Sequence, residues 1–162
     1  IIDLLTSSGM RVGELVTLNR EDINFTEREC VVLGKGNKER IVYMGSSCRK
    51  AIDRYLEERN QIVLTDNKAL FGSRDKNRIS VSAVHRLVKK HLLESGLDAS
   101  QFSAHKLRHT AATLMLANGV DLKTLQEVLG HENLNTTQIY THIENTDKKI
   151  AAEANPLSKL KL

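Results

Sequence analysis

Residues 103–142 constrain the fold most, because this stretch combines helical periodicity with polar side chains at fixed spacing. His105 and Arg108 are three residues apart, so a helix carries them on one face, with His109 and Ala112 beside them. The opposite face of this helix would carry an apolar core stripe of Leu107, Ala111 and Leu114. The stretch therefore predicts a helix with a functional side and a buried side.

A second helix is predicted from Asp121 to Leu129, where Gly130 supplies a left-handed cap. His131 follows directly, and Tyr140 lies nine residues further on. An arginine, two histidines and a tyrosine thus fall at the edges of short helices. Guanidinium and imidazole groups bind phosphate well, so this grouping predicts a phosphate-handling site.

Upstream, the sequence predicts several helices and one β-hairpin. Helical periodicity and caps indicate helices at 1–8, 11–18, 46–59 and 80–95. Two β-branched runs, 30–33 and 40–44, flank the turn-rich segment 34–38, which is typical of a hairpin. A polar turn is expected at 19–26, a mostly looped segment at 65–79 with a short strand at 69–71, and a last helix at about 147–154.

The charge of the chain permits a nucleic-acid partner without establishing one. Its 162 residues suit a single domain, and 24 Lys plus Arg against 20 Asp plus Glu give a net charge of +4. Cys30 and Cys48 lack metal-ligand spacing, so free thiols in a reducing cytosol are expected. No apolar run is long enough for a membrane span, and no signal peptide is visible.

Five motifs occur in one order along the chain. They read TSSGMRVGEL at 6–15, GKGNKER at 34–40, HKLRHT at 105–110, LGH at 129–131 and TTQIYTH at 136–142. Together they resemble the boxes of the tyrosine recombinases, which include phage integrases, bacterial Xer recombinases and the integrases of conjugative transposons. One departure is Ala104, where many members of that family have proline. The resemblance implies a mainly α fold with a small antiparallel β-sheet, the catalytic-domain fold of the DNA breaking-rejoining enzymes.

The resemblance also implies catalytic roles for six residues. Arg11 and Arg108 would bind the scissile phosphate, His105 would handle a proton and His131 would donate to a phosphate oxygen. Lys35 on the hairpin would protonate the leaving 5′-oxygen, and Tyr140 would be the nucleophile that forms a 3′-phosphotyrosyl bond. Neither a metal nor another cofactor is implied.

Some of these residues also have plainer interpretations. Arg11 and Glu14 could form only a surface ion pair, whereas the resemblance makes Glu14 the acidic support of the arginine. Lys35 could be a solvated hairpin tip, and Lys38 is the second choice for its role. Tyr140 could be a core aromatic, and His105 with His109 could in principle bind zinc, although no further ligand completes that set.

The expected partner is a double-stranded DNA recombination site. Residues expected to contact it are Lys38, Arg40, His85, Arg86, Lys89 and Lys90. The resemblance implies a homotetramer on DNA, a monomer when free, no membrane association, and a cytoplasmic protein encoded by a bacterium or phage.

The chain is expected to be a C-terminal catalytic domain, 1–162, shortened at its N-terminus and lacking the N-terminal core-binding domain. Its tail, 146–162, carries a small apolar stripe that either folds back on its own domain or docks on a neighbouring protomer.

Three other functions stay open: DNA relaxation by a type IB topoisomerase-like enzyme, a non-catalytic DNA-binding regulator, and a metal-dependent nuclease. A strand-exchange assay, a covalent-adduct assay and the effect of EDTA separate them from the recombinase.

Overall fold

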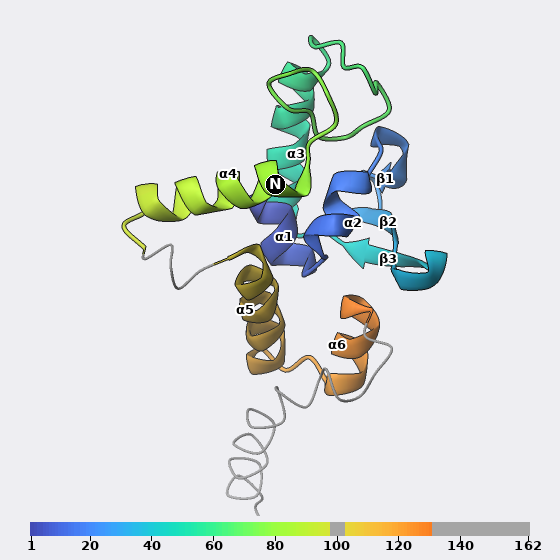
Figure 1. Ribbon diagram of the computed structural model, residues 1–162. Helices are drawn as coiled ribbons and strands as arrows, with labels where there is room; N and C mark the ends of the chain where they lie inside the picture. Colours follow the sequence, from blue (N-terminus) through green and yellow to red (C-terminus); the bar gives the residue numbers. More distant parts are fainter. Residues whose placement is uncertain (98–102, 131–162) are drawn as a thin grey trace, which may run out of the picture. The chain divides into compact units, whose positions relative to one another are not determined.

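The computed structural model describes residues 1–97 and 103–130, so expectations for the segment after Gly130 lie outside it. The chain divides into two compact units, residues 1–111 and 112–162, and each is considered by itself. The elements in chain order are α1 (Ile2–Ser8), α2 (Val12–Thr17), η1 (Arg20–Asp22), β1 (Ile23–Asn24), β2 (Glu29–Leu33), η2 (Lys35–Asn37), β3 (Glu39–Tyr43), α3 (Ser46–Arg59), α4 (Val81–Glu94), α5 (Ala104–Ala117) and α6 (Leu122–Leu129). This mainly helical architecture with a small antiparallel sheet confirms the predicted fold class (Figure 1).

A left-handed glycine separates the first two helices. Gly9 has φ 62° and its backbone N–H donates to the carbonyl of Leu5, which ends α1. Helix α2 begins after Arg11, whose extended backbone makes it the N-cap. Glycine adopts this conformation without the steric penalty that other residues incur, so the chain can reverse sharply between two short helices. Both predicted helices are confirmed.

The sheet has three antiparallel strands in the order β1-β2-β3. Cys30 pairs with Val42 and Val32 pairs with Arg40, so these residues point to one face. That face is inward, because Cys30, Val32 and Val42 are all fully or almost fully buried. The hairpin of β2 and β3 was predicted, whereas β1 falls in a segment predicted to be a polar turn. A two-residue strand is too short for its alternation to be recognised in the sequence.

Helices α3 and α4 also belong to the larger unit, with α3 packed against α1 and α4 packed against α2. Helix α4 begins where the Ser80 hydroxyl accepts a hydrogen bond from the N–H of Ala83. The segment between α3 and α4 forms two isolated β-bridges, one between Ala69 and Asn19 and one between Gly72 and Arg78. The prediction of a short strand at 69–71 is therefore wrong. Its apolar residues are buried beside the end of α2 rather than paired along a ladder.

The buried side of α5 differs from the prediction. Ala104, Arg108, Ala111 and Ala112 are buried, whereas Leu114 is 56% exposed. Positions 104, 108, 111 and 112 lie on one face of an α-helix, because residues three and four apart are neighbours there. The face that carries Arg108 thus contributes to the interior, and the predicted stripe holds for Ala111 and in part for Leu107, but not for Leu114.

The smaller unit contains the end of α5 and all of α6. Its described core consists of Ala112, Leu116, Leu125 and Leu129. Asp121 caps α6 by accepting from the N–H of Thr124 at 3.0 Å, and Gly130 ends the helix with φ 63°. The predicted helix and its glycine cap are confirmed. Within the described part of the chain, every helix is too short or too polar to cross a bilayer.

Candidate active site

The site is built around the turn that joins α1 to α2. Arg11 occupies the N-cap of α2, and its backbone N–H donates to Oε2 of Glu14 at 2.7 Å. Its guanidinium Nη1 donates to Oε1 of the same carboxylate at 3.0 Å. The glutamate at the third helical position therefore fixes both the backbone and the side chain of Arg11. The side chain of Arg11 still has 43% of its surface exposed, so it remains accessible to a ligand.

Glu14 also binds a second arginine, which comes from the hairpin. Nη1 of Arg40 donates to Oε1 of Glu14 at 2.6 Å, and Nη2 donates to Oε2 at 2.8 Å. This two-pronged contact matches the planar fork of guanidinium to the two carboxylate oxygens. The residues lie 26 positions apart in sequence. The side chain of Glu14 is 5% exposed and that of Arg40 is 14% exposed, so the pair is largely shielded from water.

The two arginines keep Glu14 ionised. Burial by itself would raise the pKa of the Glu14 carboxyl, because a low-dielectric environment disfavours charge. The hydrogen bonds from Arg40 and Arg11 and the charge of Arg40 outweigh burial, and the pKa lies below its ordinary value. One carboxylate is thus shared by two guanidinium groups, which leaves an excess positive charge for an anionic ligand.

Arg108 joins this group from α5. It is 7% exposed, and its Nη1 donates to the carbonyl oxygen of Gly9 across 99 residues of sequence. Gly9 precedes Arg11 by two residues, so Arg108 is anchored on the same turn that sets Arg11. The structure therefore brings Arg11, Glu14 and Arg108 together, as the sequence predicted, and adds Arg40. An arrangement of this kind binds an anion with two oxygens to satisfy, such as a phosphodiester.

The hairpin that carries Lys35 is closed by a hydrogen bond from the N–H of Gly34 to the carbonyl of Lys38 at 2.8 Å. Lys35 begins the short helical turn η2, in which Gly36 has φ 75°. Because β3 follows this turn directly, Arg40 attaches the base of the hairpin to Glu14. The backbone of Lys35 is thereby tied to the turn that carries Arg11.

Of the histidines predicted at the site, only some lie among the residues that the structure describes. His105 is exposed on the first turn of α5, one turn before Arg108, and His109 is exposed on the next turn. His131 and Tyr140 lie outside the described residues. The roles assigned to His105, His131 and Tyr140 stay predictions. Among the residues that the structure describes, no group of three or more His, Cys, Asp or Glu could hold a metal ion.

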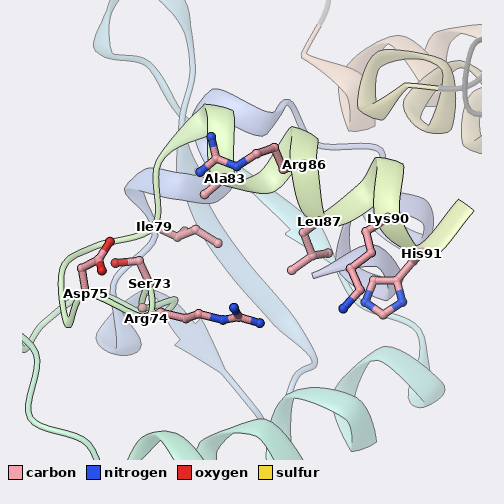
Figure 2. Close-up of a pocket in the computed structure, with 10 residues that line it drawn as sticks. Ser73, Arg74, Asp75, Ile79, Ala83, Arg86, Leu87, Lys90 and His91 are labelled. Atoms are coloured by element: carbon pink, nitrogen blue, oxygen red, sulfur yellow. The ribbon is translucent and has the colours of Figure 1, made fainter. Parts of the chain in front are cut away.

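The basic residues of α4 face away from the core, as predicted. His85, Arg86, Lys89 and Lys90 are all exposed, while Val84 and Val88 are buried. A groove of about 520 Å³ is lined by Arg74, Arg86 and Lys90. Figure 2 shows Arg86 and Lys90 on α4 and Arg74 on the loop before the helix. Lys90 pairs with Glu94 at 3.6 Å, an exposed contact that contributes little. The DNA contacts predicted for this helix stay predictions.

Sequence reasoning missed the pairing of Arg40 with Glu14 and the position of Arg74 in the groove. The sequence contained a signal for the Arg40 pairing, because Arg40 lies two residues before Val42 and therefore shares the inward, otherwise apolar face of the strand. An inward arginine requires a buried acceptor. No comparable signal marks Arg74, which lies in a loop without periodicity. Arg40, predicted as a DNA contact, instead has its described contacts inside the protein, on Glu14.

Comparisons with known proteins agree with this architecture. The sequence model of the phage integrase family matches residues 1–147. The chain is 51% identical to tyrosine recombinase XerC of Caldanaerobacter subterraneus subsp. tengcongensis over 160 residues, which covers 98% of this chain and 45% of that protein. The chain thus spans about half the length of the curated relatives it matches.

Solved structures give the same fold. The crystal structure of XerA recombinase superposes with a TM-score of 0.82 and 36% identity, covering 95% of this chain and 56% of that one. XerH site-specific recombinase, bound to its palindromic difH substrate in a post-cleavage complex, gives a TM-score of 0.78 and 29% identity, with 98% of this chain and 45% of that one covered. Both likenesses extend over nearly all of this chain.

Proposed function

The chain belongs to the phage integrase family, and from this premise we propose that it is the catalytic part of a site-specific tyrosine recombinase. The reaction would cleave a DNA strand through a 3′-phosphotyrosyl intermediate and rejoin it to a different strand. The observation that carries this proposal is the convergence of Arg11 and Arg108 on the Gly9 turn, with Glu14 fixing Arg11. Similarity to recombinases with the same fold supports it.

The arginines perform the electrostatic part of the reaction. Negative charge builds on the non-bridging oxygens of a phosphodiester as a nucleophile approaches, and permanently charged guanidinium groups stabilise that charge. Arg11 is half exposed and faces a ligand more readily than Arg108, which is held deeper by Gly9. The excess positive charge around Glu14 attracts the phosphate before chemistry begins.

We assign proton transfer and nucleophilic attack to the four other residues that the resemblance implies. Tyr140 attacks the phosphorus, and its phenolic oxygen becomes the new ester oxygen. Lys35 gives a proton to the departing 5′-oxygen, while His105 handles the proton of the phenol and His131 donates to a phosphate oxygen. Because the ester bond is kept as phosphotyrosine, a 5′-hydroxyl of another strand can reverse the step without an external energy source.

A double-stranded recombination site is the proposed substrate, and a homotetramer on that DNA is the proposed assembly. Structures of XerH recombinase bound to difH substrates support a DNA partner. Phosphate contacts dominate such binding, so affinity should fall steeply with salt. Exposed basic residues on α4 are available for those contacts.

The test is trapping of the covalent intermediate from a pool of nicked duplexes with randomised sequence beside the nick, at low salt. Denaturing extraction retains only DNA that is bonded to protein, and sequencing of that DNA identifies the site. The expected result is an adduct on Tyr140 that forms in EDTA and is absent in Tyr140→Phe. A Tyr43→Phe variant, changed at an exposed tyrosine of β3, serves as the matched control.

Other results would contradict the proposal. An adduct that persists in Tyr140→Phe would assign the nucleophile elsewhere, and sequence-specific binding without any adduct would favour a non-catalytic regulator. Cleavage that depends on a metal would favour a nuclease. Once the site is known, relaxation of supercoiled DNA without exchange between two sites would favour a topoisomerase-like enzyme.

A further inference from the structure

The carboxylate of Glu14 is the junction between two segments that the proposed reaction needs. It receives four hydrogen bonds, two from Arg11 and two from Arg40, at 2.6 to 3.0 Å. Arg11 would bind the phosphate, but Arg40 lies in β3, immediately after the hairpin that carries Lys35. A single buried group therefore connects the phosphate-binding arginine with the element expected to supply a proton.

Arg40 also lies near the base of the hairpin. A methyl group placed on Gly34 would be in van der Waals contact with Nη1 of Arg40, at 3.7 Å, so the guanidinium is a neighbour of this residue. Gly34 immediately precedes Lys35 and closes the hairpin through its bond to Lys38. With its side chain 14% exposed and both terminal nitrogens on Glu14, Arg40 is poorly placed to bind a DNA phosphate.

We propose that Arg40 is a positioning residue, which through Glu14 holds Arg11 and the base of the Lys35 hairpin in one fixed arrangement. This inference rests on the proposed function, and it replaces the DNA contact predicted for Arg40. Arg40 does not touch the phosphate. Its loss releases the hairpin and leaves Glu14 with Arg11 as its described arginine partner, so the proton donor and the phosphate-binding group are no longer set relative to each other.

A guanidinium is required at this position for a geometric reason. Lysine would keep the charge but offers a single nitrogen, which cannot reach both oxygens of Glu14 in the planar arrangement seen for Arg40. Arg40→Lys should therefore restore part of the function lost in Arg40→Gln. A role that depended only on charge would be restored fully.

The experiment compares the chain with Arg40→Gln, Arg40→Lys and the matched control Arg49→Gln, which removes an equal charge from a partly exposed pair with Asp53. Single-turnover cleavage of a nicked duplex recovered with the unaltered chain is measured at saturating protein. DNA affinity is measured separately on the unnicked duplex. Arg40→Gln should lower the cleavage rate by up to about 100-fold, as a misplaced reacting group does, with affinity close to that of Arg49→Gln.

Amide hydrogen exchange at Gly34 gives a readout that does not require activity. In Arg40→Gln this amide should exchange faster, by about tenfold, because local opening of the hairpin becomes easier, and in Arg49→Gln it should not change. Arg40→Lys should fall between them, and it keeps the proposal testable if Arg40→Gln does not fold.

Two results would overturn the positioning role. Unchanged cleavage and unchanged Gly34 exchange in Arg40→Gln would remove any link between this residue and the hairpin. Weaker DNA binding with a reduced salt slope and an unchanged cleavage rate would make Arg40 a phosphate contact. If the unaltered chain forms no adduct, the proposed function fails by itself, and Gly34 exchange still decides the positioning role.

Discussion

Glu14 and Arg40 should depend on each other for their contribution to stability, and a double-mutant cycle measures this directly. Glu14→Gln keeps the shape of the side chain but replaces one oxygen with an amide that cannot accept. The replaced oxygen would oppose a donor whichever way the amide turns, because each oxygen of Glu14 binds both arginines. Arg40→Gln leaves a buried carboxylate with Arg11 as its described arginine partner.

The magnitude follows from burial. Removing one partner of a buried ion pair costs about 3–5 kcal/mol, and Arg40 keeps some access to water, so each single variant should lose about 3 kcal/mol. The double variant lacks the charges of both Glu14 and Arg40, so neither residue leaves the other as an unpaired buried charge. Its loss should fall short of the sum of the single losses by about 2 kcal/mol. Urea unfolding at pH 7 gives the three free energies of unfolding.

The pH dependence provides an independent check of sign. The folded-state pKa of Glu14 is below its ordinary value of 4.5, so the folded state favours the ionised carboxylate. Its contribution to stability is therefore complete above the unfolded pKa and disappears as the pH falls through the folded pKa. The difference in unfolding free energy between the unaltered chain and Glu14→Gln should be constant near neutral pH and shrink below about pH 4.5. If the losses of the two single variants add up to that of the double variant within about 0.5 kcal/mol, the coupling between Glu14 and Arg40 is refuted. If the stability difference between the unaltered chain and Glu14→Gln grows in acid, the role of the ionised carboxylate is refuted.

Three further predictions concern the scaffold. Arg78→Ala should lower the free energy of unfolding by about 3 kcal/mol, because Arg78 binds two backbone carbonyls at the end of α2 and the carboxylate of Asp66. Urea unfolding measures this loss, and a change below about 0.5 kcal/mol would contradict the prediction. Ser80→Ala should lower the free energy of unfolding by about 1 kcal/mol through loss of the α4 cap, whereas Ser82→Ala, at an exposed position in the first turn, should change it little. Equal losses for the two variants in thermal unfolding would argue against the cap. Burial raises the pKa of Cys30 to about 12, so this thiol should react with iodoacetamide at pH 8 only after denaturation. Mass spectrometry measures the labelling, and labelling of Cys30 in the native chain would contradict the prediction.

Most of the helical framework was accessible from the sequence because its boundaries are local. Gly9, Ser80, Asp121 and Gly130 are cap residues whose effect depends on backbone conformation within a few positions. The hairpin was equally accessible, since β-branched runs flank a turn. These elements could be predicted without knowing what packs against them. The short strand β1 could not, because two residues contain no periodicity and only their pairing with β2 defines them.

The active-site cluster could be predicted only in part from the sequence. The resemblance implies Arg11, Arg108 and Glu14 as the support of Arg11, but not the contact of Arg40 with Glu14 or that of Arg108 with the Gly9 carbonyl. Arg40 is predicted as a DNA contact, but its register opposite the buried Val32 places it on the inward face of the sheet. The partner that makes this tolerable, Glu14, is 26 residues away and on a helix. Local reasoning has no access to such a contact.

The position of Arg108 shows why the buried side of α5 was misjudged. A helix end leaves carbonyl groups without partners inside the helix, and the left-handed Gly9 ends α1 in this way. Arg108 donates to the Gly9 carbonyl, so an arginine can be buried on a face that otherwise carries alanines. The same turn places Arg11 at the start of α2. Both phosphate-binding candidates are therefore positioned by one backbone reversal, and their spacing depends on the conformation of Gly9.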